Sequence, residues 1–189
     1  TLKNICAETI NFDFPLVPIT DTISSLELFH GPTLAFKDVG ARFMSRCLGY
    51  FSKQARAENA AANDQKSQED KTQDEKPSTV LVATSGDTGG AVANGFLGVT
   101  GVNVIILYPK GKVSPIQELQ LTTLGQNIIA LEVDGSFDDC QAIVKEAFMD
   151  GELNEAYNLT SANSINVARW LPQQTRSPRA VPRQAQVRR

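Results

Sequence analysis

The sequence predicts an α/β fold, in which a parallel sheet carries helices on both faces. Four short apolar runs have the length of buried strands, and they lie at residues 79–84, 102–107, 128–133 and 156–159. Helical patterns separate these runs, and such alternation is typical of a parallel sheet that is covered on both sides. The 189 residues are enough for one domain with a hydrophobic core.

The run at 102–107 is followed by a clear helix signal. Ser114 stands at the expected N-cap, and Pro115 takes the first helical position, where its missing N–H is no loss. Gln117 lies where its side chain can reach back to the cap. We expect this helix to end near Gly125.

Two further helices have recognisable starts. Ser136 precedes two acids in the first turn of a helix that should end at Gly151. Asp38 begins another helix, in which apolar residues recur at helical spacing along one face.

Composition narrows the classes of function. The chain is 41% hydrophobic and has a net charge of −3, and no apolar run reaches the length of a membrane span. An acidic body is a poor match for nucleic acid, so we expect neither a nucleic-acid partner nor a membrane partner. Cys6, Cys47 and Cys140 are widely spaced, without a metal-ligand pattern, which favours reduced thiols in the cytoplasm and no metal site.

Two segments differ from the rest. Residues 52–76 contain no Val, Ile, Leu, Phe or Tyr, and we interpret them as a solvated insertion, disordered or loosely helical. Residues 176–189 hold five arginines and no acid, and they are expected to form a disordered tail. The expected organisation is therefore part of one domain over residues 1–175, followed by this tail. The chain begins with Thr1, without a signal-peptide pattern, so we expect the natural start to lie upstream.

Lys37 lies in the apolar stretch 34–37, immediately before the helix that Asp38 begins. A lysine in a desolvated position at a helix start suits a nucleophilic amine of the kind that forms Schiff bases. The alternative is a lysine that extends from the helix end into water.

The segment from Thr84 to Gly90 follows a predicted strand and opens a helix. Glycines allow a ligand to approach the backbone, and N–H groups with hydroxyls at a helix start bind anions. The segment lacks the Gly-Lys-Ser/Thr of a P-loop and the G-x-G-x-x-G pattern. We interpret it as an anion-binding loop, with a purely structural turn as the alternative.

The segment 161–169 follows the last predicted strand, and its Ser, Asn and Arg side chains suit a phosphate. The alternative is an N-cap next to a surface arginine. His30, the only histidine, is interpreted as a structural hydrogen-bonding residue, because a Ser-His-Asp triad has little support.

Four segments, in this order, resemble the threonine synthase family. They read LELFHGPTLAFKDVGARF, VATSGDTGGAV, ILYPKGKVSPIQELQLTTL and NSINVAR. The resemblance covers about residues 1–173, apart from the insertion at 52–76. It implies pyridoxal 5'-phosphate (PLP) as cofactor and the tryptophan-synthase-β-like fold, fold type II.

The resemblance also implies a reaction, the conversion of O-phospho-L-homoserine and water to L-threonine and phosphate. By the same resemblance, Lys37 holds PLP as an imine and moves protons, and Asp87 faces the cofactor's ring hydroxyl. The substrate carboxylate is bound by Thr84, Ser85 and Thr88, and the leaving phosphate by Asn163, Ser164 and Arg169.

The family continues well beyond NSINVAR, and that part carries the loop for the PLP phosphate and the group facing the ring nitrogen. We therefore expect this chain to be incomplete at both ends and inactive alone. Two alternatives stay open: another fold-type-II PLP enzyme, such as a serine dehydratase or a cysteine synthase, and a silent homologue that binds phosphorylated ligands. The sequence leaves the oligomeric state open.

Overall fold

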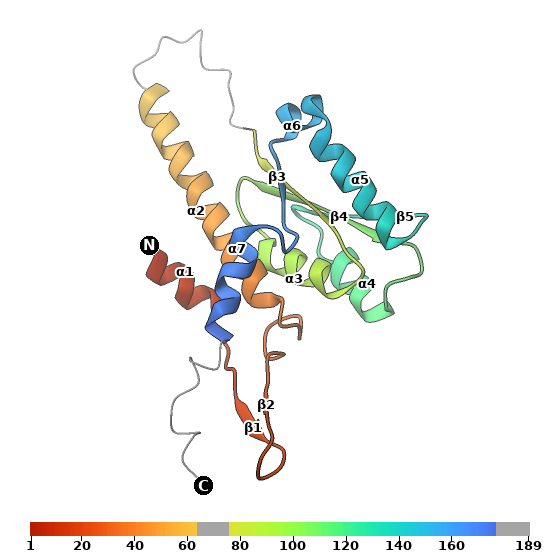
Figure 1. Cartoon of the computed structure of the whole chain (residues 1–189). Helices are drawn as coiled ribbons and strands as arrows, with labels where there is room; N and C mark the ends of the chain where they lie inside the picture. Colours follow the sequence, from red (N-terminus) through yellow and green to blue (C-terminus); the bar gives the residue numbers. More distant parts are fainter. Residues whose placement is uncertain (64–75, 177–189) are drawn as a thin grey trace.

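A four-stranded sheet forms the centre of the computed structural model, which describes residues 1–63 and 76–176 (Figure 1). The strands lie in the order β5-β4-β3-β6, and every neighbouring pair is parallel. Their bounds are β3 Ser78–Ala83, β4 Val102–Pro109, β5 Ile128–Val133 and β6 Leu159–Ser161. The predicted parallel sheet is thus confirmed.

Helices cover both faces of this sheet, and each face has its own core (Figure 1). The larger core joins the sheet to helices on one face and contains Phe96, Ile106 and Leu121. The smaller core joins β3 and β4 to a helix on the other face through Cys140 and Val144. The helices of the first face are α2 Asp38–Asn63, α3 Asp87–Phe96, α4 Pro115–Thr122 and α7 Val167–Trp170, and that of the second is α5 Phe137–Met149.

The remaining elements lie at the periphery. They are α1 Leu2–Thr9, β1 Leu16–Pro18, β2 Ser24–Leu26, α6 Gly151–Tyr157 and a 3-10 helix Leu171–Arg176. β1 and β2 form an antiparallel hairpin that extends away from the sheet (Figure 1). Arg42 of α2 ties α1 to the domain, since its guanidinium donates to the Thr9 carbonyl at 3.2 Å. Within residues 1–63 and 76–176, no helix is long and apolar enough to span a bilayer.

The strand predicted at 156–159 is wrong in its position. Residues Ala156 and Tyr157 complete α6, Asn158 turns the chain in the left-handed conformation with φ 48°, and β6 begins only at Leu159. Asparagine tolerates this conformation, so it ends a helix where the apolar pattern had indicated a strand.

Two predicted helix ends also differ. Gly151, expected to end α5, is the first residue of α6, because the Asp150 side chain caps that helix by accepting from the Leu153 N–H at 3.0 Å. α4 ends at Thr122, earlier than the predicted end near Gly125.

The polar segment 52–76 is helical over its first part, because α2 runs to Asn63. Residues 52–63 therefore follow the helical alternative of that prediction. The rest of the predicted insertion, residues 64–75, and most of the predicted tail, residues 177–189, lie outside the described residues.

Candidate active site

Lys37 lies at the junction between a tight turn and α2. The turn is held by Asp38, which is 1% exposed and accepts from the Thr33 N–H at 2.9 Å and the Thr33 hydroxyl at 2.5 Å. Because Asp38 fixes the chain directly after it, the Lys37 side chain leaves the helix start in a defined direction. It is 30% exposed, so its amine is accessible to a small molecule.

The loop after β3 is shaped from within by Thr84. This side chain is 1% exposed, and its hydroxyl accepts from the N–H groups of Gly86 at 3.0 Å and Gly89 at 2.8 Å. The same hydroxyl donates to the Gly86 carbonyl at 3.0 Å. Its hydrogen-bonding capacity is used up by the loop, so in this conformation Thr84 shapes the loop and leaves ligand contacts to its neighbours. Ser85 is exposed and Thr88 is half-buried.

The structure brings Lys37 and Asp87 together, although fifty positions separate them in the sequence. The Lys37 Nζ atom lies 3.9 Å from Oδ2 of Asp87, the first residue of α3. The Asp87 side chain is 47% exposed, so the pair faces solvent at the carboxyl end of β3. Open α/β sheets bind their ligands at this end of the strands.

The segment after β6 lies beside the loop after β3. The Asn163 amide donates to the carbonyl of Ala83, the last residue of β3, at 3.2 Å. Asn163 is itself held by Ser161, whose hydroxyl accepts from the Asn163 N–H at 3.1 Å. Ser164 is exposed at this edge. All three predicted segments, with Lys37, the loop after β3 and the segment after β6, therefore meet at one end of the sheet.

Arg169 is placed differently from its predicted neighbours. Its side chain is 4% exposed, and its terminal nitrogen donates to the Ala162 carbonyl. The Nε atom is buried and has no hydrogen-bond partner among the described residues. Burial lowers the pKa of the Arg169 guanidinium to about 10. In this conformation the guanidinium is bound to the backbone of the segment after β6, at Ala162, and it is not accessible to a ligand from solvent.

Gln117 is a residue of this site that sequence reasoning assigned to another task. It reaches back to the helix cap as predicted, and in addition its amide donates to Oδ1 of Asp87 at 2.5 Å. Ser114 holds the other end of the amide, with its hydroxyl donating to Oε1 of Gln117 at 2.9 Å. The signal in the sequence was the Ser-Pro-x-Gln pattern, which shows a capped helix but not the direction of the glutamine.

His30 has the hydrogen-bonding role predicted for it. Its Nε2 atom lies 2.7 Å from Oε2 of Glu27, and its ring stacks on Phe29 with centroids 4.8 Å apart. The His30 side chain is 38% exposed.

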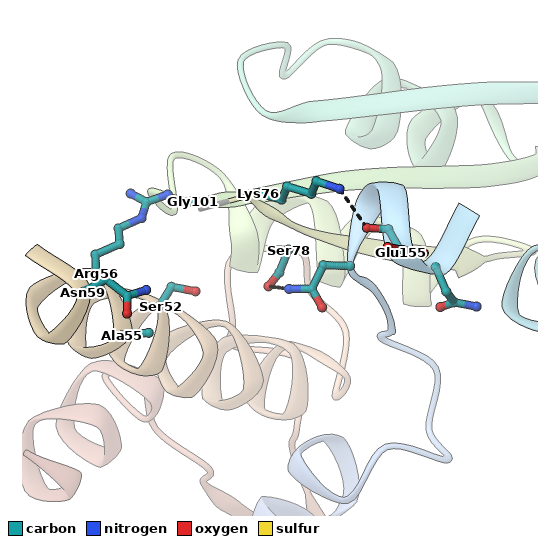
Figure 2. Close-up of a pocket in the computed structure, with 10 residues that line it drawn as sticks. Ser52, Ala55, Arg56, Asn59, Lys76, Ser78, Gly101 and Glu155 are labelled. Atoms are coloured by element: carbon teal, nitrogen blue, oxygen red, sulfur yellow. Dashed lines mark hydrogen bonds between the residues drawn. The ribbon is translucent and has the colours of Figure 1, made fainter. Parts of the chain in front are cut away.

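A cavity of about 610 Å³ opens at the opposite, amino end of the strands, next to Ser78 and Gly101 (Figure 2). Two cations contribute to its lining, but Figure 2 shows Arg56 and Lys76 pointing in different directions. The Lys76 amine donates to the backbone carbonyl of Glu155 at 3.2 Å. Cations that diverge in this way do not form a converging anion site, and the cavity is remote from Lys37.

The groups around Lys37 suit an aldehyde-bearing anionic cofactor. An accessible primary amine supplies the nucleophile, and the amino end of the ten-residue helix α3 favours negative charge. Gly86 gives the loop a backbone conformation with φ 151° that residues with side chains rarely adopt, and the exposed Ser85 precedes it.

Comparison with known proteins agrees with a site for such a cofactor. The family model described as pyridoxal-phosphate dependent enzyme matches residues 25–186. The chain is 50% identical over 172 residues to threonine synthase of Serratia marcescens, with 91% of this chain and 35% of that protein covered. It is 48% identical over 162 residues to threonine synthase of Escherichia coli, with 86% of this chain and 33% of that protein covered.

Solved structures show the same likeness in three dimensions. Threonine synthase from Escherichia coli superposes with a TM-score of 0.75 at 46% identity, covering 91% of this chain and 35% of that one. Threonine synthase from yeast gives a TM-score of 0.77 at 42% identity, covering 93% of this chain and 34% of that one. The chain thus spans about a third of the length of the relatives it matches.

Proposed function

Since the chain belongs to the family of pyridoxal-phosphate dependent enzymes, we propose that it contributes the reactive lysine to a threonine synthase. The proposed reaction converts O-phospho-L-homoserine and water to L-threonine and phosphate. The observation that carries the proposal is the approach of Lys37 to Asp87 at 3.9 Å, at the edge of the sheet where ligands bind. The likeness to threonine synthases over about 90% of the chain supports the choice of reaction.

Lys37 is the proposed covalent attachment point of the cofactor. When bound, PLP supplies an electron sink that stabilises negative charge at the substrate Cα. The Lys37 amine would be the group that takes the proton from the substrate Cα and returns it later. Asp87 orients the amine and is proposed to face the cofactor's ring hydroxyl.

The loop after β3 is proposed to bind the substrate carboxylate. Ser85 is exposed and Thr88 is half-buried, so these two side chains are available for the contact. Thr84, also predicted to bind the carboxylate, has its hydroxyl engaged by Gly86 and Gly89. Its proposed contribution is to hold the loop open for the other two.

The segment after β6 is proposed to bind the phosphate that leaves from Cγ. Ser164 is exposed, and Asn163 is anchored beside the loop after β3. A fixed positive charge nearby stabilises the departing dianion, and Arg169 is the cation that this segment offers. Reaching the phosphate requires its buried guanidinium to exchange the Ala162 carbonyl for the ligand.

The proposal extends to the domain organisation, the partners and the compartment of the protein. Residues 1–175 are proposed to form part of one PLP-enzyme domain, with residues 176–189 as a separate tail. The partner is a small molecule, and neither nucleic acid nor a membrane is involved. The cytoplasm is the proposed compartment, because Cys6, Cys47 and Cys140 are free thiols of the kind that a reducing compartment maintains.

Borohydride reduction tests the attachment point. In the longest form of the protein that contains this chain, reduction with PLP present, followed by peptide mapping, should leave the pyridoxyl group on Lys37. The same preparation should release phosphate from O-phospho-L-homoserine, and Lys37→Ala should abolish that release. A label on Lys110 or Lys112 would overturn the assignment of Lys37. Turnover of serine without release of phosphate from phosphohomoserine would favour a dehydratase instead.

A further inference from the structure

We propose that Gln117 is a positioning residue, which holds the Asp87 carboxylate in place against Lys37. The inference rests on the proposed function only in taking Lys37 and Asp87 as the reactive pair. It assigns a task to α4, the helix that begins at Pro115 and that no part of the proposed chemistry uses.

The Gln117 amide is fixed at both ends, which determines the direction in which it donates. Its oxygen accepts from the Ser114 hydroxyl at 2.9 Å, and its nitrogen donates to Oδ1 of Asp87 at 2.5 Å. Ser114 is in turn held as the N-cap of α4, since its hydroxyl accepts from the Gln117 N–H at 3.4 Å. The start of α4 therefore aims one N–H group at one carboxylate oxygen.

The two oxygens of Asp87 then have separate tasks. With Oδ1 bound to Gln117, the other oxygen, Oδ2, is the one that lies 3.9 Å from Nζ of Lys37. An exposed carboxylate without such a tether rotates among several orientations, and it gives a neighbouring cation a weaker average contact. Gln117 restricts the rotation of the Asp87 carboxylate by binding Oδ1, the oxygen that is not paired with the lysine.

The backbone of the loop has a shape that fits the same amide. A Cβ atom on Gly86 would come within 2.7 Å of both Nε2 and Oε1 of Gln117, so the carboxamide packs directly on the glycine. Gly86 also has φ 151°, a conformation that side chains rarely adopt. Gln117 therefore contacts the residue before Asp87 as well as Asp87 itself, and α4 supports the start of α3 at two consecutive positions.

The chemistry requires an amide at this position. The N–H group donates to the ionised carboxylate and adds no charge, whereas a glutamate here would repel Asp87 and compete for Lys37. Methionine has nearly the same length and shape but no donor. Gln117→Met therefore removes the tether with little change in packing.

A labelling experiment on the cofactor-free chain tests the coupling. The rate at which acetic anhydride acylates Lys37 is measured by mass spectrometry, with Lys110 as the internal reference, in four proteins. They are the wild type, Gln117→Met, Asp87→Asn and the double variant. Loss of a nearby carboxylate leaves the amine more reactive, so Asp87→Asn should raise the relative rate about two- to five-fold.

The expected result is that Gln117→Met raises the rate in the same direction and that the double variant matches Asp87→Asn alone. Such non-additivity shows that Gln117 acts through Asp87. Gln120→Met, on the same helix one turn further on, is the matched control and should leave the rate unchanged. The thermal unfolding midpoint should be the same in Gln117→Met and Gln120→Met, which separates positioning from loss of fold.

Additive effects of the two substitutions, or a wild-type rate in Gln117→Met, would overturn the inference. Its failure is distinct from that of the proposed function. If the pyridoxyl label falls on another lysine while the rates are non-additive, the proposed function is wrong, but the positioning of Asp87 by Gln117 is confirmed. If the label falls on Lys37 while the rates are additive, only the positioning role of Gln117 is wrong.

Discussion

Arg169 is a charged side chain in a nearly closed environment. It has one hydrogen bond, to the Ala162 carbonyl, and a buried Nε atom without a partner among the residues described. Burial removes water from the guanidinium and lowers its pKa to about 10. The folded chain therefore binds this proton less tightly than the unfolded chain, and the buried charge destabilises the fold wherever both states are charged.

We expect Arg169→Met to change how stability depends on pH. Below a pH of about 10 the wild type carries the full cost of the buried charge, and above it the folded protein releases the proton while the unfolded chain still holds it. The free energy of unfolding of the wild type, relative to Arg169→Met, should then rise by about 1 kcal/mol between about pH 9 and about pH 11. Urea unfolding of both proteins at each pH gives this difference. A constant difference across the range would contradict the expectation.

Short sequence motifs made several individual site residues predictable. Lys37 and Asp87 stand in segments whose residue types already indicate a nucleophile and an anion loop, and the structure brings them together. Gln117 was predicted to reach the helix cap, which it does through Ser114, but its second partner, Asp87, lies thirty residues away and is reached only when α4 packs on α3. The burial of Arg169 was also hidden, because an arginine in a short helix gives the same pattern whether it faces water or the core.

At the scale of elements, the start of α5 is held by a reciprocal pair of contacts. The Ser136 hydroxyl accepts from the Asp139 N–H at 3.2 Å, and the Asp139 carboxylate accepts from the Ser136 N–H at 2.6 Å. α5 supplies Cys140 and Val144 to the core on one face of the sheet. Loss of this cap would therefore also disturb the core, because Cys140 and Val144 lie in the first turns of the helix.

Ser136→Ala should lower the unfolding temperature by about a few degrees, and Ser136→Thr, which keeps the hydroxyl, should restore most of it. The contacts with Ser136 lower the pKa of Asp139 below its ordinary value of 3.8. The carboxylate thus stabilises the fold above that value, and the effect is lost as the pH falls through the lower folded pKa. The difference between Ser136→Ala and the wild type should shrink in acid. Thermal melts followed by circular dichroism, at neutral and acidic pH, measure both effects.

The two central strands and the edge strand β5 were predictable, whereas the other edge strand, β6, was not. β3 and β4 are buried on both faces, so their apolar runs carry an unambiguous signal. β6 has only three residues, all half-buried, and it pairs with β3 alone. Its position depends on Asn158, whose left-handed turn ends α6 just before the strand. A single-residue turn of this kind leaves no periodic pattern in the sequence, which explains the misplaced strand.

At the scale of the whole molecule, the parallel sheet explains why distant segments share one site. The loop after β3 and the segment after β6 leave the same edge of the sheet because their strands are parallel neighbours. Lys37 reaches that edge from the start of α2, which packs on α3. The surface around this edge also includes apolar side chains that are open to water, since Leu34 is 72% exposed and Ile116 is 73% exposed.

We expect the 189-residue chain alone to release no phosphate from O-phospho-L-homoserine at a sustained rate. The chain spans about a third of its relatives, and the resemblance places the loop for the cofactor phosphate and the partner of the ring nitrogen in the remaining part. Each missing charge-assisted contact weakens cofactor binding by about 1.5–3 kcal/mol. The exposed surroundings of Lys37 and Asp87 also leave their interaction screened by water, where fixed charges stabilise a transition state least.

Phosphate release by the purified chain, with PLP added in excess, measures this directly, and threonine synthase from Escherichia coli is the positive control. A slow reaction of Lys37 with free PLP changes the absorbance without turnover, so absorbance does not replace the assay. Sustained release that disappears in Lys37→Ala would mean that the 189-residue chain holds the cofactor by itself. The groups at the carboxyl edge of its sheet would then suffice for catalysis. The absence of release from the chain, with activity in the longer protein, would instead place the remaining cofactor contacts outside these residues.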